Sequence, residues 1–414
     1  MGLTRDRLEY ILLSTMLFLV FFRTSGIGIG YPNVESQLGS ASYLPQKLAQ
    51  ALILGLIIVY VYIYPKCLQA LRFNSVSLML LGLAIVLSIV LSHYKGLSVR
   101  YLLSFVVVIL PLCFYRARFG INAMVHNFSV FVFLVLICSF IYALLLPQYG
   151  IMAANHAGAL RGLFLHKNVF GFFCVLTSLF CLYYIISKNA SNNKLYAFIY
   201  FLSFIGVAKS QSTTSLVLFG LGLICFVFFT FILSLSNPKV RVILYYLFLA
   251  IVFVSTFTFS VYFEQITYAL GKDPTLTGRT ELWEILFYVG MDKPLFGHGL
   301  GLFSRPEIMH QFSLDFGWEA KSAHNSFLDV FLGIGFVGLF AFLSLVLTNI
   351  FKFPFSHYAS ANRVLSASGI VTILCFGFSE SGAFMGVGFI WLTFIIFLFL
   401  SSNTSFSRNQ LNQH

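Results

Sequence analysis

Hydrophobic and polar positions divide this chain into long apolar runs joined by short polar connections. Runs of about 17 to 25 apolar residues are long enough to cross a membrane as helices, and they lack the alternation of outer-membrane barrel strands. We expect about twelve spans, at residues 8–30, 47–64, 76–93, 99–115, 124–146, 164–187, 194–208, 211–235, 241–262, 324–350, 362–380 and 384–401. The seventh and eighth are separated only by polar residues 209–215, so they form either a helix pair with a tight turn or one broken helix that dips back.

One long polar segment, residues 263–323, interrupts this pattern. It is rich in acidic residues, namely Glu264, Asp273, Glu281, Glu284, Asp292, Glu307, Asp315 and Glu319. The sequence therefore predicts one integral membrane domain in three parts. These are transmembrane helices 1 to 9 in residues 1–262, an extracytoplasmic loop in 263–323, and helices 10 to 12 with a cytoplasmic tail in 324–414.

Composition supports the same class of protein. The chain is 59% hydrophobic and only 9% charged, with a mean hydropathy of +0.91, whereas about a quarter of residues are charged in soluble globular proteins. A soluble globule is therefore excluded. The seven cysteines are scattered through apolar segments without CxxC spacing, as is typical of small buried hydrophobic residues rather than of metal ligands or disulfides.

Basic residues predict the orientation, because short cytoplasmic loops are enriched in Lys and Arg. With both termini in the cytoplasm, the inner side receives Arg5, Arg7, Lys66, Arg72, Arg116, Arg118, Lys188, Lys194, Lys239, Arg241, Lys352, Arg363 and Arg408. The long loop then faces outward. This topology accounts for most of the net charge of +12, which would also favour anionic membrane lipid, and nothing indicates a nucleic-acid partner.

Within the long loop, Leu282, Ile285, Leu286 and Val289 recur at helical spacing. They predict a short amphipathic helix that lies on the membrane surface or packs against the bundle. Trp283 on this helix either stacks on a sugar or anchors the helix at the interface.

The turn that follows, residues 292–301, has three alternating glycines but lacks the βαβ context of a nucleotide-binding fingerprint. His298, Glu307, His310 and His324 are of zinc-ligand type, but their spacing matches no metal motif, so we expect no metal site.

Three outer connections converge in this topology: residues 147–163, 209–215 and the long loop. The first ends near Arg161, which we expect to open a helix that places Lys167 about 9 Å below it and Asn168 on the same face. Cations beside a membrane suit phosphate or pyrophosphate. The alternative for Arg161 and Lys167 is that they extend to the lipid headgroups.

His324 and Asn325 begin the tenth span, with Asp329 one turn later. A histidine at this position could act as a general base or could be an interfacial cap. Asp329 either orients His324 or Asn325 or satisfies a buried polar contact.

Five blocks of sequence stand out, in the order residues 161–171 (RGLFLHKNVFG), 210–215 (SQSTTS), 276–283 (LTGRTELW), 294–303 (PLFGHGLGLF) and 323–339 (AHNSFLDVFLGIGFVGL). Together they resemble the bacterial O-antigen ligase and Wzy-type polymerase family. The resemblance implies an all-α, GT-C-type bundle in the bacterial inner membrane, with its active site facing the periplasm. It also implies an inverting glycosyltransferase that uses undecaprenyl-pyrophosphate-linked glycans, with no nucleotide sugar, obligatory metal or other cofactor.

By the same resemblance, Arg161 and Arg279 would contact the pyrophosphate, and His324 would activate the acceptor hydroxyl. Lys167, Asn168, Trp283 and Asn325 would be further substrate-binding residues. A chain-length regulator and a flippase of the same pathway would be partners.

The amino-acid sequences of these blocks resemble the polymerase branch, which joins lipid-linked repeat units, more than the ligases, which transfer glycan to lipid A-core. A transporter or flippase for the same lipids is a further alternative, but no similarity between the two halves of the chain supports it.

Overall fold

The computed structural model describes residues 5–28, 44–71, 76–153, 156–187, 192–262, 265, 268, 279–305, 322–355, 360–384 and 388–401. Over these residues the protein is built from helices, and the only strand-like pairings there are two isolated bridges, Ile27 with Phe164 and Ile151 with Leu160.

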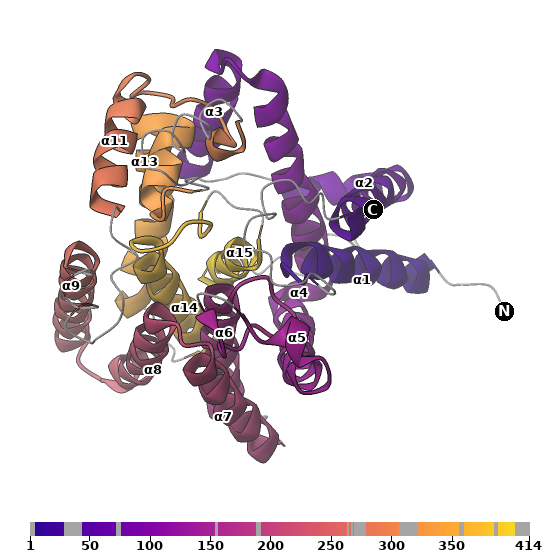
Figure 1. The fold of residues 1–414 in the computed structure, drawn as a ribbon. Coiled ribbons are helices and arrows are strands. Elements are labelled where there is room, and N and C mark those ends of the chain that lie inside the picture. The colour runs from indigo at the N-terminus through magenta and orange to yellow at the C-terminus, as the bar shows by residue number, and fades with distance from the viewer. Residues whose placement is uncertain are drawn as a thin grey trace.

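The helices form one bundle (Figure 1). They are α1 (Arg5–Thr24), α2 (Leu44–Ile63), α3 (Val76–Leu91), α4 (Lys95–Leu145), α5 (Pro147–Gly150), α6 (Lys167–Ile186), α7 (Asn193–Lys209), α8 (Thr213–Ser234), α9 (Pro238–Val261), α11 (Arg279–Met291), α13 (Ser326–Phe351), α14 (Ala361–Gly377) and α15 (Phe389–Ser401). Every predicted span falls on one of them. The seventh and eighth spans are the separate helices α7 and α8, so the helix-pair alternative is the one observed.

Six of these helices are long and apolar enough to cross a membrane: α2, α4, α6, α8, α9 and α13. Helices α3, α14 and α15 are apolar but shorter. A polytopic membrane protein is therefore confirmed as the class, while the number of twelve crossings stays a prediction.

Helix α4 covers two of the predicted spans, and it is interrupted by a sharp bend at Gly120. This glycine has φ 83° and ψ 167°, a backbone conformation that L-residues with side chains avoid. The two segments on either side of it, predicted at 99–115 and 124–146, are thus helices joined at one residue without a loop.

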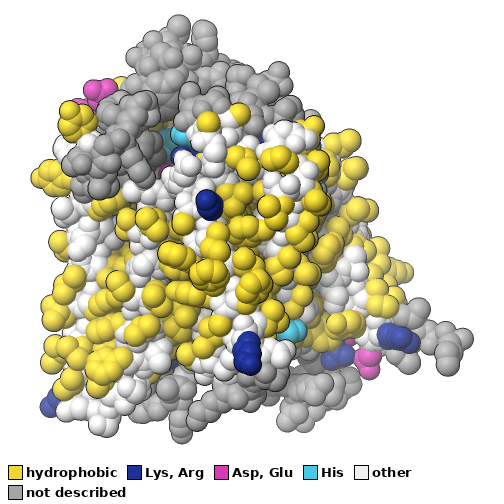
Figure 2. Space-filling model, turned by 60° about the horizontal axis from the view of Figure 1, so that its bottom comes forward, with side chains coloured by type: hydrophobic (Ala, Val, Ile, Leu, Met, Phe, Trp, Pro, Cys, Tyr) yellow, Lys and Arg dark blue, Asp and Glu magenta, His cyan; other side chains and the backbone are white. Residues whose placement is uncertain are grey.

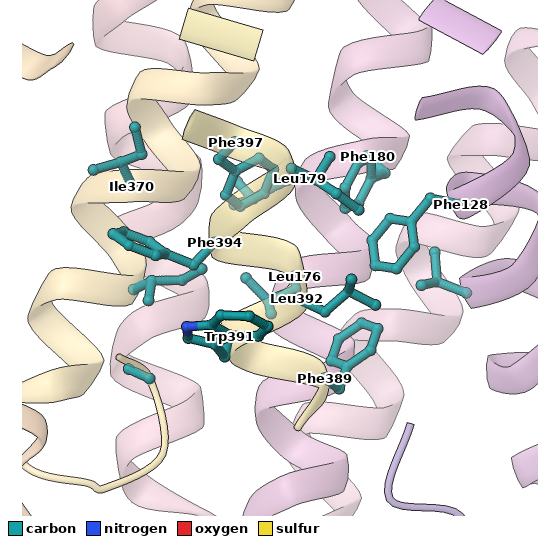
Figure 3. Packing of buried hydrophobic residues seen from close by; sticks show 14 of the residues in the cluster. Phe128, Leu176, Leu179, Phe180, Ile370, Phe389, Trp391, Leu392, Phe394 and Phe397 are labelled. Carbon is teal, nitrogen blue, oxygen red and sulfur yellow. The ribbon is translucent and has the colours of Figure 1, made fainter. Parts of the chain in front are cut away.

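Aromatic packing around α15 forms the centre of the core. Figure 3 shows Phe389, Trp391 and Phe397 of α15 between α4 and α6 on one side and α14 on the other. The rings of Phe180 and Phe397 stack at 5.6 Å between centroids, and those of Phe128 and Phe389 also at 5.6 Å. Rings of this size fill the space between helices and fix their rotation.

Outside the core, the bundle presents a largely apolar surface. Figure 2 shows hydrophobic side chains over most of one face, with few charged side chains among them. Helix α9 is an example, because Ile243, Leu247, Ile251 and Val254 are all more than half exposed. An extensive apolar surface is unusual for a soluble protein and is what a lipid-facing surface requires.

Polar contacts mark one end of the bundle, which we call the Arg118 end. Arg118 bonds Asp6 at 2.9 Å and Glu9 at 2.8 Å, and the guanidinium of Arg116 lies 4.8 Å from the ring centroid of Phe399. The beginning of α1, the bend of α4 and the end of α15 therefore lie together. The opposite end carries the candidate site.

Candidate active site

His324 lies in the connection that enters α13, at the end of the bundle opposite Arg118. The helix begins at Ser326 with Asn325 as its N-cap, so His324 precedes the helix instead of opening it, because the Asn325 side chain supplies the cap. His324 has φ 48°, and the only other non-glycine residue with positive φ in the described part of the chain is Gln211, in the 209–215 turn. Left-handed backbone costs a residue with a side chain roughly 1 to 3 kcal/mol, and such strain concentrates at functional sites.

The imidazole of His324 contacts a carboxylate that the sequence analysis did not select. Its Nδ1 lies 3.3 Å from Oε2 of Glu380, which follows the end of α14. The histidine side chain is 33% exposed and the glutamate 14%. With Nδ1–H donating to Glu380, Nε2 is the nitrogen free to accept a proton, which is the arrangement of a general base with an orienting acid.

Asn325 uses its amide group within the protein. Its Oδ1 accepts hydrogen bonds from the backbone N–H of Phe327 and Leu328 at 3.0 and 3.1 Å, and its Nδ2 donates to the carbonyl of Phe378 at 3.4 Å. These bonds cap α13 and join it to the end of α14. A substrate-binding role for Asn325 stays a prediction.

Two side chains hold the peptide just before His324. The indole Nε1–H of Trp283 donates to the carbonyl of Ala323 at 2.8 Å, and the N–H of Ala323 donates to Oδ1 of Asp329 at 3.3 Å. Trp283 therefore anchors its helix to the site segment. Asp329 thus makes a polar contact with the backbone before His324, and orientation of the His324 or Asn325 side chain by Asp329 stays a prediction.

Helix α11 is the predicted amphipathic helix, and it packs against α13. Leu282 and Leu286 are fully buried and share a small apolar cluster with Leu332 of α13, whereas Ile285 is 37% exposed. Two fully buried leucines stabilise such a docking by roughly 2 kcal/mol each. Arg279 is the first residue of α11, and its side chain lies outside the described part of the structure.

The glycine-rich turn after α11 inserts its backbone into a break in α13. At Gly335, with φ 69°, the helix loses its regular hydrogen bonds. The turn replaces them, because the N–H groups of His298 and Gly299 donate to the carbonyls of Leu332 and Gly333 at 2.8 and 3.0 Å. In the other direction, the N–H of Phe336 donates to the carbonyl of Pro294 at 2.8 Å. These glycines therefore allow close backbone pairing inside the protein.

His298, in this turn, is engaged with backbone. Its Nε2 lies 2.7 Å from the carbonyl of Val289, and burial lowers the pKa of His298, an effect that Lys293 and Arg305 reinforce. Glu307 and His310 lie outside the described residues. Among the residues described, no group of three or more His, Cys, Asp or Glu could hold a metal ion.

Arg161 does not open a helix, contrary to the expectation from the sequence. Gly162 has φ 56°, and α6 begins only at Lys167, where the His166 side chain caps it by accepting from the N–H of Asn168 at 3.2 Å. Arg161 is instead a buried loop residue, 4% exposed.

The guanidinium of Arg161 bonds backbone carbonyls: Nε donates to Tyr149 at 2.7 Å and Nη1 to Leu165 at 3.3 Å. Burial lowers the pKa of Arg161, but an arginine remains charged because its ordinary value is above 12. Arg161 therefore organises the loop beside α6. Its predicted pyrophosphate contact stays a prediction.

Aromatic packing connects this loop region with His324. Lys167 and Asn168 form the first turn of α6, and Phe172, one turn further on, stacks on Phe376 of α14 with 4.0 Å between ring centroids. Phe376 lies one turn before Glu380. The start of α6, the end of α14 and the start of α13 are thus at the same end of the bundle.

The 209–215 turn joins the same region. The N–H of Leu160 donates to the carbonyl of Lys209 at 2.8 Å, and Ser212 caps α8. A Cβ at Gly171 in α6 would clash with Ser210 and Ser215, so this turn lies directly against α6. All three predicted outer connections therefore contribute backbone or side chains to this end of the bundle.

The fold and site define a polytopic membrane protein with a polar, histidine-containing site at one end of its helix bundle. Residues 198–343 match the family model described as O-antigen ligase, which confirms the resemblance to the O-antigen ligase and Wzy-type family. The matched range contains Arg279, Trp283, His324 and Asn325, but not Arg161, Lys167, Asn168 or Glu380. No curated protein matches the chain.

Proposed function

We propose that the protein is a polysaccharide polymerase of the bacterial inner membrane. In this proposal it transfers an undecaprenyl-pyrophosphate-linked glycan to the acceptor hydroxyl of another lipid-linked repeat unit, with inversion at the anomeric carbon. The observation that carries the proposal is the contact between His324 and Glu380, in which His324 has strained backbone and lies within the range that matches the O-antigen ligase family model.

The residues suggest how the reaction proceeds. Nε2 of His324 takes the proton of the acceptor hydroxyl while the hydroxyl oxygen forms a bond to the anomeric carbon. The bond from that carbon to the pyrophosphate oxygen breaks, and the pyrophosphate leaves with its electron pair. Glu380 stabilises the imidazolium that forms, and a cation such as Arg279 at the beginning of α11 stabilises the departing pyrophosphate.

Ligation of glycan to lipid A-core is the second candidate, and the description of the matching family favours it. The two differ in the acceptor, whereas the base and the leaving group would be the same. Deleting the gene in its host and analysing lipid-linked sugars and surface polysaccharide by gel and mass spectrometry separates them. Single repeat units left on carrier or acceptor would identify a polymerase, whereas full-length glycan stranded on undecaprenyl pyrophosphate would identify a ligase.

Two variants test the residue roles in the complemented strain. Arg279→Ala should abolish polymer at unchanged protein abundance, since loss of a contact made in the transition state need not destabilise a helix bundle. His324→Ala should leave a residual activity that rises with pH, because the acceptor hydroxyl then reacts without its base. Normal chain length in the first, or full activity in the second, would reject the assigned role.

A further inference from the structure

Ala323 is held through both of its backbone polar groups, and the residue that follows it, His324, has an unfavourable backbone conformation. The carbonyl of Ala323 accepts from Trp283 at 2.8 Å, and its N–H donates to Asp329 at 3.3 Å. A residue such as His324 keeps a left-handed backbone only when surrounding contacts over-determine it. Removing one of these contacts should therefore let the backbone relax.

Trp283 also lies on the helix that begins with Arg279. The two residues are four positions apart in α11, which is about one helical turn. Burial of Leu282 and Leu286 against α13 keeps this helix in place. A single indole hydrogen bond thus joins the helix of the candidate pyrophosphate arginine to the backbone of the candidate base.

We propose that Trp283 is a positioning residue, which fixes the backbone of His324 through the carbonyl of Ala323 and thereby sets the base relative to the beginning of α11. The expected effect on kcat rests on the proposed function, whereas the expected effect on the backbone of His324 does not. It differs from both sequence-based alternatives for Trp283, because neither stacking on a sugar nor anchoring at the interface needs the indole N–H.

Trp283→Phe is the informative variant, since it keeps an aromatic ring and removes the N–H donor, and Trp391→Phe, described below, controls for the accompanying change from two fused rings to one. A hydrogen bond of ordinary strength predicts a roughly threefold to tenfold fall in kcat, with KM for the lipid-linked donor unchanged. If Trp283 instead stacked on a sugar, Trp283→Phe would keep its kcat and KM, and Trp283→Leu would raise KM.

Hydrogen–deuterium exchange of the purified full-length protein gives a readout independent of activity. The peptide covering residues 322–329 should exchange faster in Trp283→Phe than in wild type. The matched control is Trp391→Phe, because Trp391 is buried against Phe105 with 5.0 Å between ring centroids and lies in α15, in the core of the bundle. That variant should leave exchange of residues 322–329 unchanged.

Faster exchange of residues 322–329 together with a lower kcat would support the proposal. Wild-type exchange and wild-type kcat in Trp283→Phe would overturn it. Faster exchange in a protein whose wild type transfers no glycan to either acceptor would support the positioning role and reject the proposed function instead.

Discussion

Glu380→Gln is the sharpest test of the proposed base, because it removes the carboxylate charge and keeps the size of the side chain. Hydrogen bonds to charged groups stabilise by about 1.5 to 3 kcal/mol. The 3.3 Å separation is slightly beyond the usual range and the imidazole is a third exposed, so the lower figure applies. About 1.5 kcal/mol at the transition state corresponds to a roughly tenfold fall in kcat.

The assay measures initial rates with purified lipid-linked repeat units, in the presence and absence of lipid A-core. KM should not change, because Glu380 stabilises a charge that develops only during proton transfer. Glu284→Gln is the matched control, since Glu284 is exposed on α11 and should leave the rate unaltered. A Glu380→Gln rate within twofold of wild type would show that this carboxylate does not assist His324.

Three further variants probe the surroundings of the site. Gly335→Ala should destabilise the protein by roughly 2 kcal/mol or more, because its Cβ would clash with the backbone of Leu295 at positive φ, whereas Gly220→Ala in α8 meets open space and should leave Tm unchanged. Burial lowers the pKa of His298, so the unfolded chain binds more protons than the folded protein, and the protein loses stability as the pH falls below about 6.5. In His298→Gln, Tm measured between pH 5 and 7.5 should therefore depend less on pH than in wild type. An unaltered pH dependence of Tm would contradict this reasoning. Arg161→Lys should lower Tm as well as activity, since one ammonium group cannot reach both carbonyl acceptors, and a loss of activity at wild-type Tm would favour direct substrate contact over loop organisation.

Hydrophobic patterning was sufficient to locate the helices. The tight turn between α7 and α8 and the amphipathic character of α11 also followed from it, because apolar periodicity is a local property of the chain. The direct joining of two helices at Gly120 was not predicted, since a glycine that follows Arg116 and Arg118 between two apolar runs is also compatible with a short loop.

The site was predicted in part. His324 stood out because the polar segment ends there, and Trp283 because of its position in a family block. Glu380 did not, because its partnership with His324 joins residues 56 positions apart and depends on the packing of α14 beside α13. For Arg161, a cation near a membrane indicated a ligand contact, and only the structure shows that two backbone carbonyls use its guanidinium.

The break in α13 explains how residues from a long loop become part of a well-defined site. Besides the burial of Leu282 and Leu286, hydrogen bonds hold α11 at two points: Trp283 donates to the carbonyl of Ala323, and the turn after α11 pairs with the opened backbone around Gly333. Both points are on α13 or its entry, so the positions of α11 and His324 are set by the same helix. An unbroken α13 would offer no free backbone groups for this pairing, since a regular helix uses them internally. The break in α13 therefore fixes the position of α11 and of the turn that follows it beside the site, as precise catalytic geometry requires.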